Sequence, residues 1–155
     1  MKSTVELEIN APLEKVTALL ADPSSMTKWM DDLERVEPLS GEFGMPGSKF
    51  RMVGKAGSQQ SNFIVTVTAR TLPETFGLKL QSPSVDVVIT DTFTTLSARR
   101  TKLVSEEVFS FHGLFNTLFG LLAQNTIRKH HRQHIESFKR FAEDTMSALT
   151  PIATS

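Results

Sequence analysis

Three histidines near the C-terminal end are the residues best suited to chemistry: His130, His131 and His134. On an α-helix they fall within one 100° arc, on the side shared by Ile127 and Phe138. An imidazole there can move a proton near neutral pH, or anchor a carbonyl or hydroxyl group of a ligand. It can equally be a buried histidine whose nitrogens are hydrogen-bonded within the protein. Both interpretations place His131 and His134 on the inner side of the helix.

Two of these histidines also have the spacing of metal ligands. His130 and His134 are separated by four residues, as are zinc ligands on a single helix. The motif His-Glu-x-x-His is absent, however, and a carboxylate ligand would have to come from a neighbouring sheet. We therefore predict neither a metal site nor another cofactor.

Two carboxyl groups are further candidates, provided that they face the core. Glu107 shares one face of the strand over 101–111 with Leu103. If that face is the inner one, burial raises the pKa of its carboxyl group, as a catalytic acid or base requires. If Val104 points inward instead, Glu107 lies in solvent. Asp91 carries the same ambiguity in the preceding strand, so the candidates for catalysis are His131, His134 and Glu107.

Hydrophobic side chains at alternate strand positions are expected to line a ligand cavity. Together with Asp91, Glu107, His131 and His134, the predicted ligand-binding residues are Phe63, Val65, Phe76, Leu78, Val87, Ile89, Phe93, Phe109, Phe119 and Phe138. The chain contains 11 phenylalanines and no tyrosine, which favours a hydrophobic ligand over a highly polar one.

The elements that must position these residues follow from hydrophobic periodicity. Alternation over residues 5–9 predicts a strand, and Pro12 is well placed to begin a helix that ends at Asp22-Pro23. A second short helix carries Trp29, which we expect to be a packing residue. Six further strands are predicted over residues 36–40, 48–53, 62–70, 76–80, 85–95 and 102–111.

The last 40 residues differ from the strands before them. Glycine and proline are absent between Leu121 and Thr150, where hydrophobic residues recur at helical spacing. This predicts one long helix, with a bend near Gly120.

These elements predict an α+β fold, in which a curved seven-stranded antiparallel sheet wraps around the long C-terminal helix. Two short helices follow the first strand. One helix cannot close tightly along a whole curved sheet, so a cavity is expected between them. Residues 1–150 are predicted to form a single domain, and residues 151–155 a disordered tail.

Composition excludes several classes of protein. With no cysteine there are no disulfides, thiolate metal sites or cysteine nucleophiles, and a net charge of zero gives no argument for nucleic-acid binding. No signal peptide is recognisable, and the most apolar window, residues 114–123, is too short to span a bilayer, so we expect a cytoplasmic protein. The run 114–122, followed by Arg128 and Lys129, is compatible with peripheral membrane contact.

Several motifs resemble the START-like superfamily (SRPBCC, Bet v 1-like, helix-grip), and in particular its polyketide cyclase/dehydrase-like members. The residues that carry the resemblance are Ala11-Pro12-Leu13-Glu14-Lys15-Val16, Asp22-Pro23, Trp29, the turn Gly44 to Gly47 before Phe50, and His134, Phe138, Lys139 and Phe141. The resemblance implies a hydrophobic cavity for lipids, sterols, polyketides, quinones or hormones. Some relatives are cyclases, whereas others are transfer or chaperone proteins.

The functional prediction is a carrier or binding protein for a small hydrophobic molecule, as a monomer or a homodimer. One alternative is a cyclase or dehydratase in which His131, His134 or Glu107 moves protons. Another is a quinone- or lipid-linked chaperone that works at a membrane surface.

Overall fold

The computed structural model describes residues 1–56 and 59–149. The predicted tail over 151–155 lies outside the described residues. The elements in chain order are β1 (Lys2–Ile9), α1 (Leu13–Leu20), the 3-10 turn η1 (Pro23–Ser25), α2 (Met26–Trp29), β2 (Leu33–Ser40), β3 (Lys49–Ala56), β4 (Gln59–Thr71), β5 (Thr75–Gln81), β6 (Val85–Ser97), β7 (Arg100–Phe111), α3 (Gly113–Leu122) and α4 (Gln124–Leu149).

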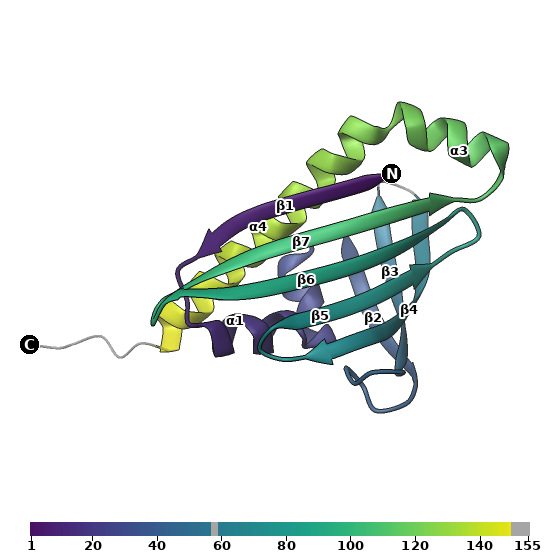
Figure 1. Cartoon of the computed structure of the whole chain (residues 1–155). Helices are drawn as coiled ribbons and strands as arrows, with labels where there is room; N and C mark the ends of the chain where they lie inside the picture. The colour runs from purple at the N-terminus through teal and green to yellow at the C-terminus, as the bar shows by residue number, and fades with distance from the viewer. Residues whose placement is uncertain (57–58, 150–155) are drawn as a thin grey trace, which may run out of the picture.

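The seven strands form one antiparallel sheet in the order β1-β7-β6-β5-β4-β3-β2. The sheet is strongly curved, and α4 crosses its concave side together with α1 and α2 (Figure 1). The first and last strands of the chain are neighbours, so β1 is held at one edge of the sheet by its pairing with β7. This architecture confirms the predicted α+β fold with a sheet wrapped around a C-terminal helix.

The segment that follows β1 brings Trp29 into the core. Pro12 precedes the first turn of α1, where its missing N–H costs nothing. Asp22 then accepts a hydrogen bond from the backbone N–H of Ser24 at 3.0 Å, which begins the 3-10 turn and redirects the chain into α2. Trp29 at the end of α2 is buried and packs edge-on against Phe138 of α4, with ring centroids 5.3 Å apart. This contact ties the short helices to the long one.

The register of β7 determines on which face of the sheet Glu107 lies. Leu103 and Ser105 are buried on the concave face, whereas Val108 is exposed on the convex face. Because side chains alternate along a strand, Glu107 shares the concave face with Leu103. Asp91 of β6 pairs directly with Ser105 and is also buried there.

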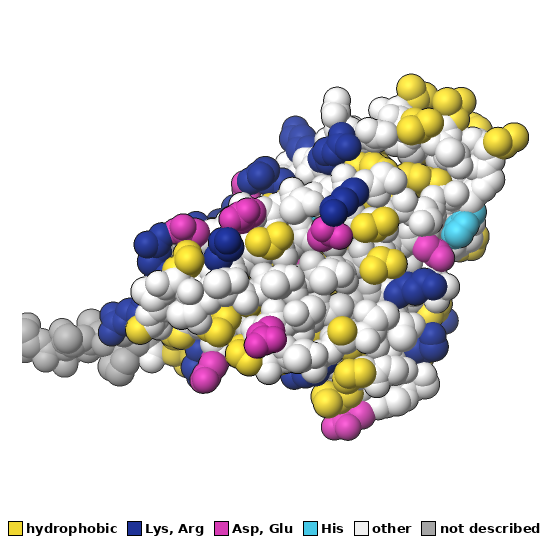
Figure 2. Space-filling view, in the orientation of Figure 1, with side chains coloured by type: hydrophobic (Ala, Val, Ile, Leu, Met, Phe, Trp, Pro, Cys, Tyr) yellow, Lys and Arg dark blue, Asp and Glu magenta, His cyan; other side chains and the backbone are white. Residues whose placement is uncertain are grey.

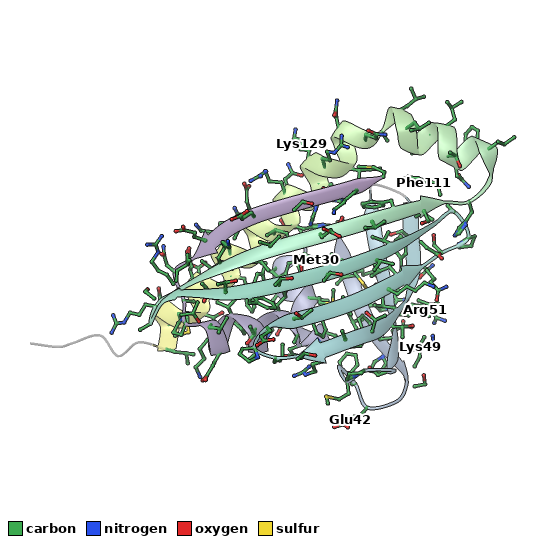
Figure 3. All side chains as sticks on the ribbon, viewed as in Figure 1. Met30, Glu42, Lys49, Arg51, Phe111 and Lys129 are labelled. Atoms are coloured by element: carbon green, nitrogen blue, oxygen red, sulfur yellow. The ribbon has the colours of Figure 1, made fainter. Side chains whose placement is uncertain are left out.

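The C-terminal region bends, but not at Gly120. Two helices, α3 and α4, meet at Ala123, and Gly120 lies inside α3. A Cβ atom on Gly120 would lie 2.5 Å from the ring of Phe111, so the glycine permits α3 to approach the end of β7 closely (Figure 3). The bend at Ala123 directs α3 away from the concave face.

As a consequence, α3 presents most of its hydrophobic side chains to solvent. Figure 2 shows these side chains gathered over the projecting helix. The exposed fraction is 92% for Leu114, 80% for Phe115 and 80% for Leu122. Among the described residues, no helix is both long enough and apolar enough to cross a membrane.

Candidate functional site

A cavity of about 330 Å³ lies between the concave face of the sheet and the helices. Its wall is mostly hydrophobic. The hydrophobic lining residues are Leu20, Met26, Trp29, Met30, Leu33, Met52, Phe63, Phe76, Leu78, Leu80, Val87, Ile89, Phe109, Ile127 and Ile135. Polar side chains interrupt this wall along α4, β6 and β7.

Ten of the predicted ligand-binding residues line this cavity. They are Phe63, Phe76, Leu78, Val87, Ile89, Asp91, Glu107, Phe109, His131 and His134. The other four do not line it. Val65, Phe93 and Phe138 are buried in solid packing beyond the cavity, and Phe119 is 62% exposed because α3 turns away from the sheet.

The part of the wall that comes from the N-terminal segment was not predicted from the sequence. Met26, Trp29 and Met30 of α2 and its C-terminal end all line the cavity, together with Leu33. Their spacing of three and four residues is that of one helical face, which was the available signal. Trp29 is therefore both a packing residue and part of the cavity wall.

His131 is held in one orientation by two serines. Its Nδ1 lies 2.8 Å from Oγ of Ser3 in β1, and its Nε2 lies 3.1 Å from Oγ of Ser105 in β7. The imidazole is buried, and burial is the main cause that lowers its pKa to about 4. At neutral pH, His131 is thus an uncharged ring with both nitrogens hydrogen-bonded.

Two carboxyl groups share the wall beside this histidine. Glu107 Oε1 lies 3.7 Å from Nε2 of His131. Burial raises the pKa of Glu107 to about 7, and the charge of Asp91 adds to this shift, while His130 opposes it. Burial also raises the pKa of Asp91 to about 7, against a hydrogen bond with Ser105 that lowers it. The wall therefore holds two acidic groups that can each carry or release a proton near neutral pH.

Two buried polar atoms in the described part of the chain have no hydrogen-bond partner: Nε1 of Trp29 and Oδ1 of Asp91. Both belong to residues of the cavity wall. An unpaired buried donor or acceptor lowers the stability of the folded protein by about 1–3 kcal/mol. A polar group of a bound molecule that paired with it would remove this loss.

A third polar group lies at the edge of the cavity. Asp32, in the turn between α2 and β2, accepts hydrogen bonds on its two carboxylate oxygens from Nε2 of His134 at 2.9 Å and Nε2 of His130 at 3.1 Å. These hydrogen bonds hold the pKa of Asp32 well below its usual range and raise the pKa of His130. The contact of Asp32 with the histidines was not predicted from the sequence, because Asp32 lies 98 positions before His130 in the chain.

The fold and the cavity agree with a comparison against protein families. A family model described as polyketide cyclase/dehydrase and lipid transport matches residues 1–143. The chain therefore belongs to this family. A comparison with curated proteins gives no significant match.

Solved structures support the same fold at low sequence identity. A Streptomyces aromatase/cyclase is 15% identical with a TM-score of 0.82, and the match covers 98% of this chain and 99% of that one. A START superfamily protein from Mycobacterium smegmatis is 16% identical with a TM-score of 0.72, covering 96% and 99%. A protein from Thermus thermophilus is 17% identical with a TM-score of 0.74, covering 97% and 100%. The fold is thus the helix-grip fold.

The buried carboxyl group of Asp91 predicts a specific pH dependence of stability. The pKa of Asp91 is about 7 in the folded protein against a reference value of 3.8. The protein therefore has its full stability below about pH 4, where this carboxyl group is protonated in both the folded and the unfolded state, and it loses stability as the pH rises through 7. Asparagine does not ionise, so a variant with asparagine at this position does not lose stability in this way. We expect Asp91→Asn to gain about 1–3 kcal/mol of unfolding free energy relative to wild type between pH 5 and pH 8.

Urea denaturation of both proteins at pH 5 and pH 8 measures this change directly. A difference between variant and wild type that stays constant over the range would contradict the burial of a titrating carboxyl group at this position.

Proposed function

We propose that the protein binds a small, largely hydrophobic molecule in the cavity and acts as a carrier or binding protein. The observation that carries this proposal is the cavity itself, about 330 Å³ in volume with a mostly hydrophobic wall. That volume falls within the range of small-molecule sites. The description of the family includes both lipid transport and polyketide chemistry, and molecules of both kinds fit such a wall.

The unpaired polar atoms favour a ligand with at least one oxygen. The indole N–H of Trp29 needs an acceptor, which a ketone, ester or hydroxyl oxygen provides. Asp91, protonated or not, offers a second polar contact deep in the same wall. The ligand we propose is therefore a hydrophobic skeleton with one or more oxygen functions.

Filling the cavity tests this proposal. Ile89 of β6 lines the cavity, whereas its neighbour Val88 is exposed on the opposite face of the same strand. We expect Ile89→Trp to weaken binding of the neutral fluorophore N-phenylnaphthylamine at least about tenfold, because the larger side chain occupies the space that the probe needs, a loss of about 1.4 kcal/mol or more.

The matched control is Val88→Trp, which adds the same side chain to the same strand outside the cavity. It is expected to bind the probe as wild type does. Circular dichroism melts establish that both variants fold, since overpacking costs about 1–3 kcal/mol. Equal binding by Ile89→Trp and Val88→Trp would show that the probe binds elsewhere and would remove the proposal.

A cyclase or dehydratase is the second candidate, and the convergence of Asp91, Glu107 and His131 supports it. In an aldol cyclisation, Glu107 would take a proton from a carbon between two carbonyl groups of the substrate. That carbon would then bond to another carbonyl carbon of the same chain, and the proton would pass to the new alkoxide oxygen. His131, fixed by Ser3 and Ser105, would position Glu107.

Substitution of Glu107 distinguishes a cyclase from a carrier. In a cyclase, Glu107→Gln should reduce the rate of cyclisation of a synthetic poly-β-keto thioester by about 100-fold or more, since it removes the acid–base group but keeps the shape. Glu106→Gln is the matched control, because Glu106 faces outward and pairs with Lys2 at 2.8 Å. Product formation is followed by chromatography with mass detection. If wild type and Glu107→Gln form the cyclised product at equal rates, this candidate fails.

We also propose that α3 touches a membrane surface where the ligand is loaded or released. Support comes from its exposed hydrophobic side chains and from the charges beside them. No aspartate or glutamate occurs between residues 108 and 135, whereas Arg128 and Lys129 lie in the first turns of α4. Lys129 projects from the outer side of α4 in Figure 3. Hydrophobic groups flanked by cations are suited to a bilayer that contains anionic lipids.

Vesicle co-sedimentation tests this contact. We expect wild type to bind vesicles with phosphatidylserine, more weakly as salt rises, and the double variant Phe115→Glu/Leu122→Glu to lose at least about tenfold in binding. The matched control is Leu39→Glu/Leu149→Glu, which places the same charges on exposed hydrophobic positions outside α3. Absence of wild-type binding at low salt, or a dimer in solution that Phe115→Glu/Leu122→Glu dissociates, would contradict membrane contact.

A further inference from the structure

Asp32, His130 and His134 form a compact group of potential metal ligands at the edge of the cavity. One ligand atom from each lies within 4.8 Å of the other two. The histidines are one helical turn apart on α4, and their ring centroids are 4.2 Å apart. The carboxylate comes from the turn between α2 and β2. From the sequence, a carboxylate ligand was expected to come from the sheet.

The ligand atoms lie near the separations that a metal ion requires. In a tetrahedral site with bonds of about 2.0–2.1 Å, neighbouring donor atoms lie roughly 3.3 Å apart. Nε2 of His134 lies 2.9 Å from Oδ1 of Asp32, and Nε2 of His130 lies 3.1 Å from Oδ2, so each histidine is near this separation from one oxygen of the carboxylate. The three ligand atoms lie within 4.8 Å of one another, so a small contraction of the group would bring them around one ion. The side chain of His130 is 54% exposed and is free to adjust by the small distance that remains.

The chemistry of the donors selects the class of metal. Two imidazole nitrogens with one carboxylate suit Zn²⁺, Co²⁺, Ni²⁺ or Fe²⁺, whereas Mg²⁺ and Ca²⁺ prefer oxygen donors throughout. Three protein ligands leave at least one coordination position open. All three residues line the cavity, and they also line a more open pocket on the outer side with Glu136 and Arg140, so the group stands between the cavity and solvent.

We propose that Asp32, His130 and His134 bind a divalent transition-metal ion at the edge of the ligand cavity. The ion would present a Lewis acid to an oxygen of a bound molecule, a capacity that a purely hydrophobic cavity lacks. This site is independent of the proposed carrier function, because its ligands bind metal whether or not the cavity is filled.

A second histidine–carboxylate pair in the molecule provides the control. His112 Nε2 lies 3.1 Å from Oδ1 of Asp86, and the described residues supply no third ligand to this pair. This pair shows how a histidine hydrogen-bonded to an aspartate responds to a metal ion when no third ligand is present. His112→Ala and Asp86→Asn therefore match His130→Ala and Asp32→Asn in chemistry, at a place without a three-ligand group.

The experiment is a titration of the untagged, chelator-treated 155-residue protein with Co²⁺, followed by the visible absorption of the coordinated ion. We expect saturable binding of one ion per chain, with competition by Zn²⁺. His130→Ala, His134→Ala and Asp32→Asn should each weaken binding at least about tenfold, and His112→Ala and Asp86→Asn should leave it unchanged.

The variant Ile89→Trp separates this proposal from the carrier function, since it should lose the hydrophobic probe but keep Co²⁺. If His134→Ala does not fold, His130→Ala decides the outcome, because the side chain of His130 is mostly exposed. The proposal is overturned if wild type gives no cobalt absorption band, or if His130→Ala binds Co²⁺ as tightly as His112→Ala does.

Discussion

The contact between α4 and the concave face of the sheet determines the rest of the structure. Along its C-terminal part the helix packs tightly, with Phe138 and Ala142 buried against the sheet and the short helices. Towards its N-terminal end the sheet curves away, and Ile127 lines open space instead. A rigid helix on a curved sheet can be close-packed at one end only. The cavity therefore follows from the way in which the curved sheet wraps around α4.

The polar residues of the cavity wall are buried among hydrophobic side chains, so their removal from water costs free energy. His131 remains buried because Ser3 and Ser105 satisfy both of its nitrogens, so its removal from water is compensated. Asp91 and Trp29 each keep one polar atom without a partner, and the pKa of Asp91 rises as a result of its burial. These unpaired polar atoms reduce the stability of the fold, and a polar group of a bound molecule would pair with them.

The sequence was sufficient for the architecture and for much of the wall, because strand alternation and helical periodicity are local signals. It identified His131 and Glu107, but two registers fitted β7 equally well, and only the pairing with β1 and β6 places Glu107 on the concave face. Phe119 was misplaced because the sequence indicates a bend near Gly120 but not its direction, and α3 turns away from the sheet. Asp32 was missed because its approach to His130 and His134 depends on the tertiary path of α2, which no local pattern encodes.

A hydrophobic molecule held in the cavity would be detected by native mass spectrometry of the freshly purified protein. We expect the mass of the chain plus one small molecule, released as a hydrophobic compound with at least one oxygen function when the collision energy is raised. The contradicting result is the mass of the bare chain alone, both as purified and after incubation with fatty acids, quinones and aromatic polyketides.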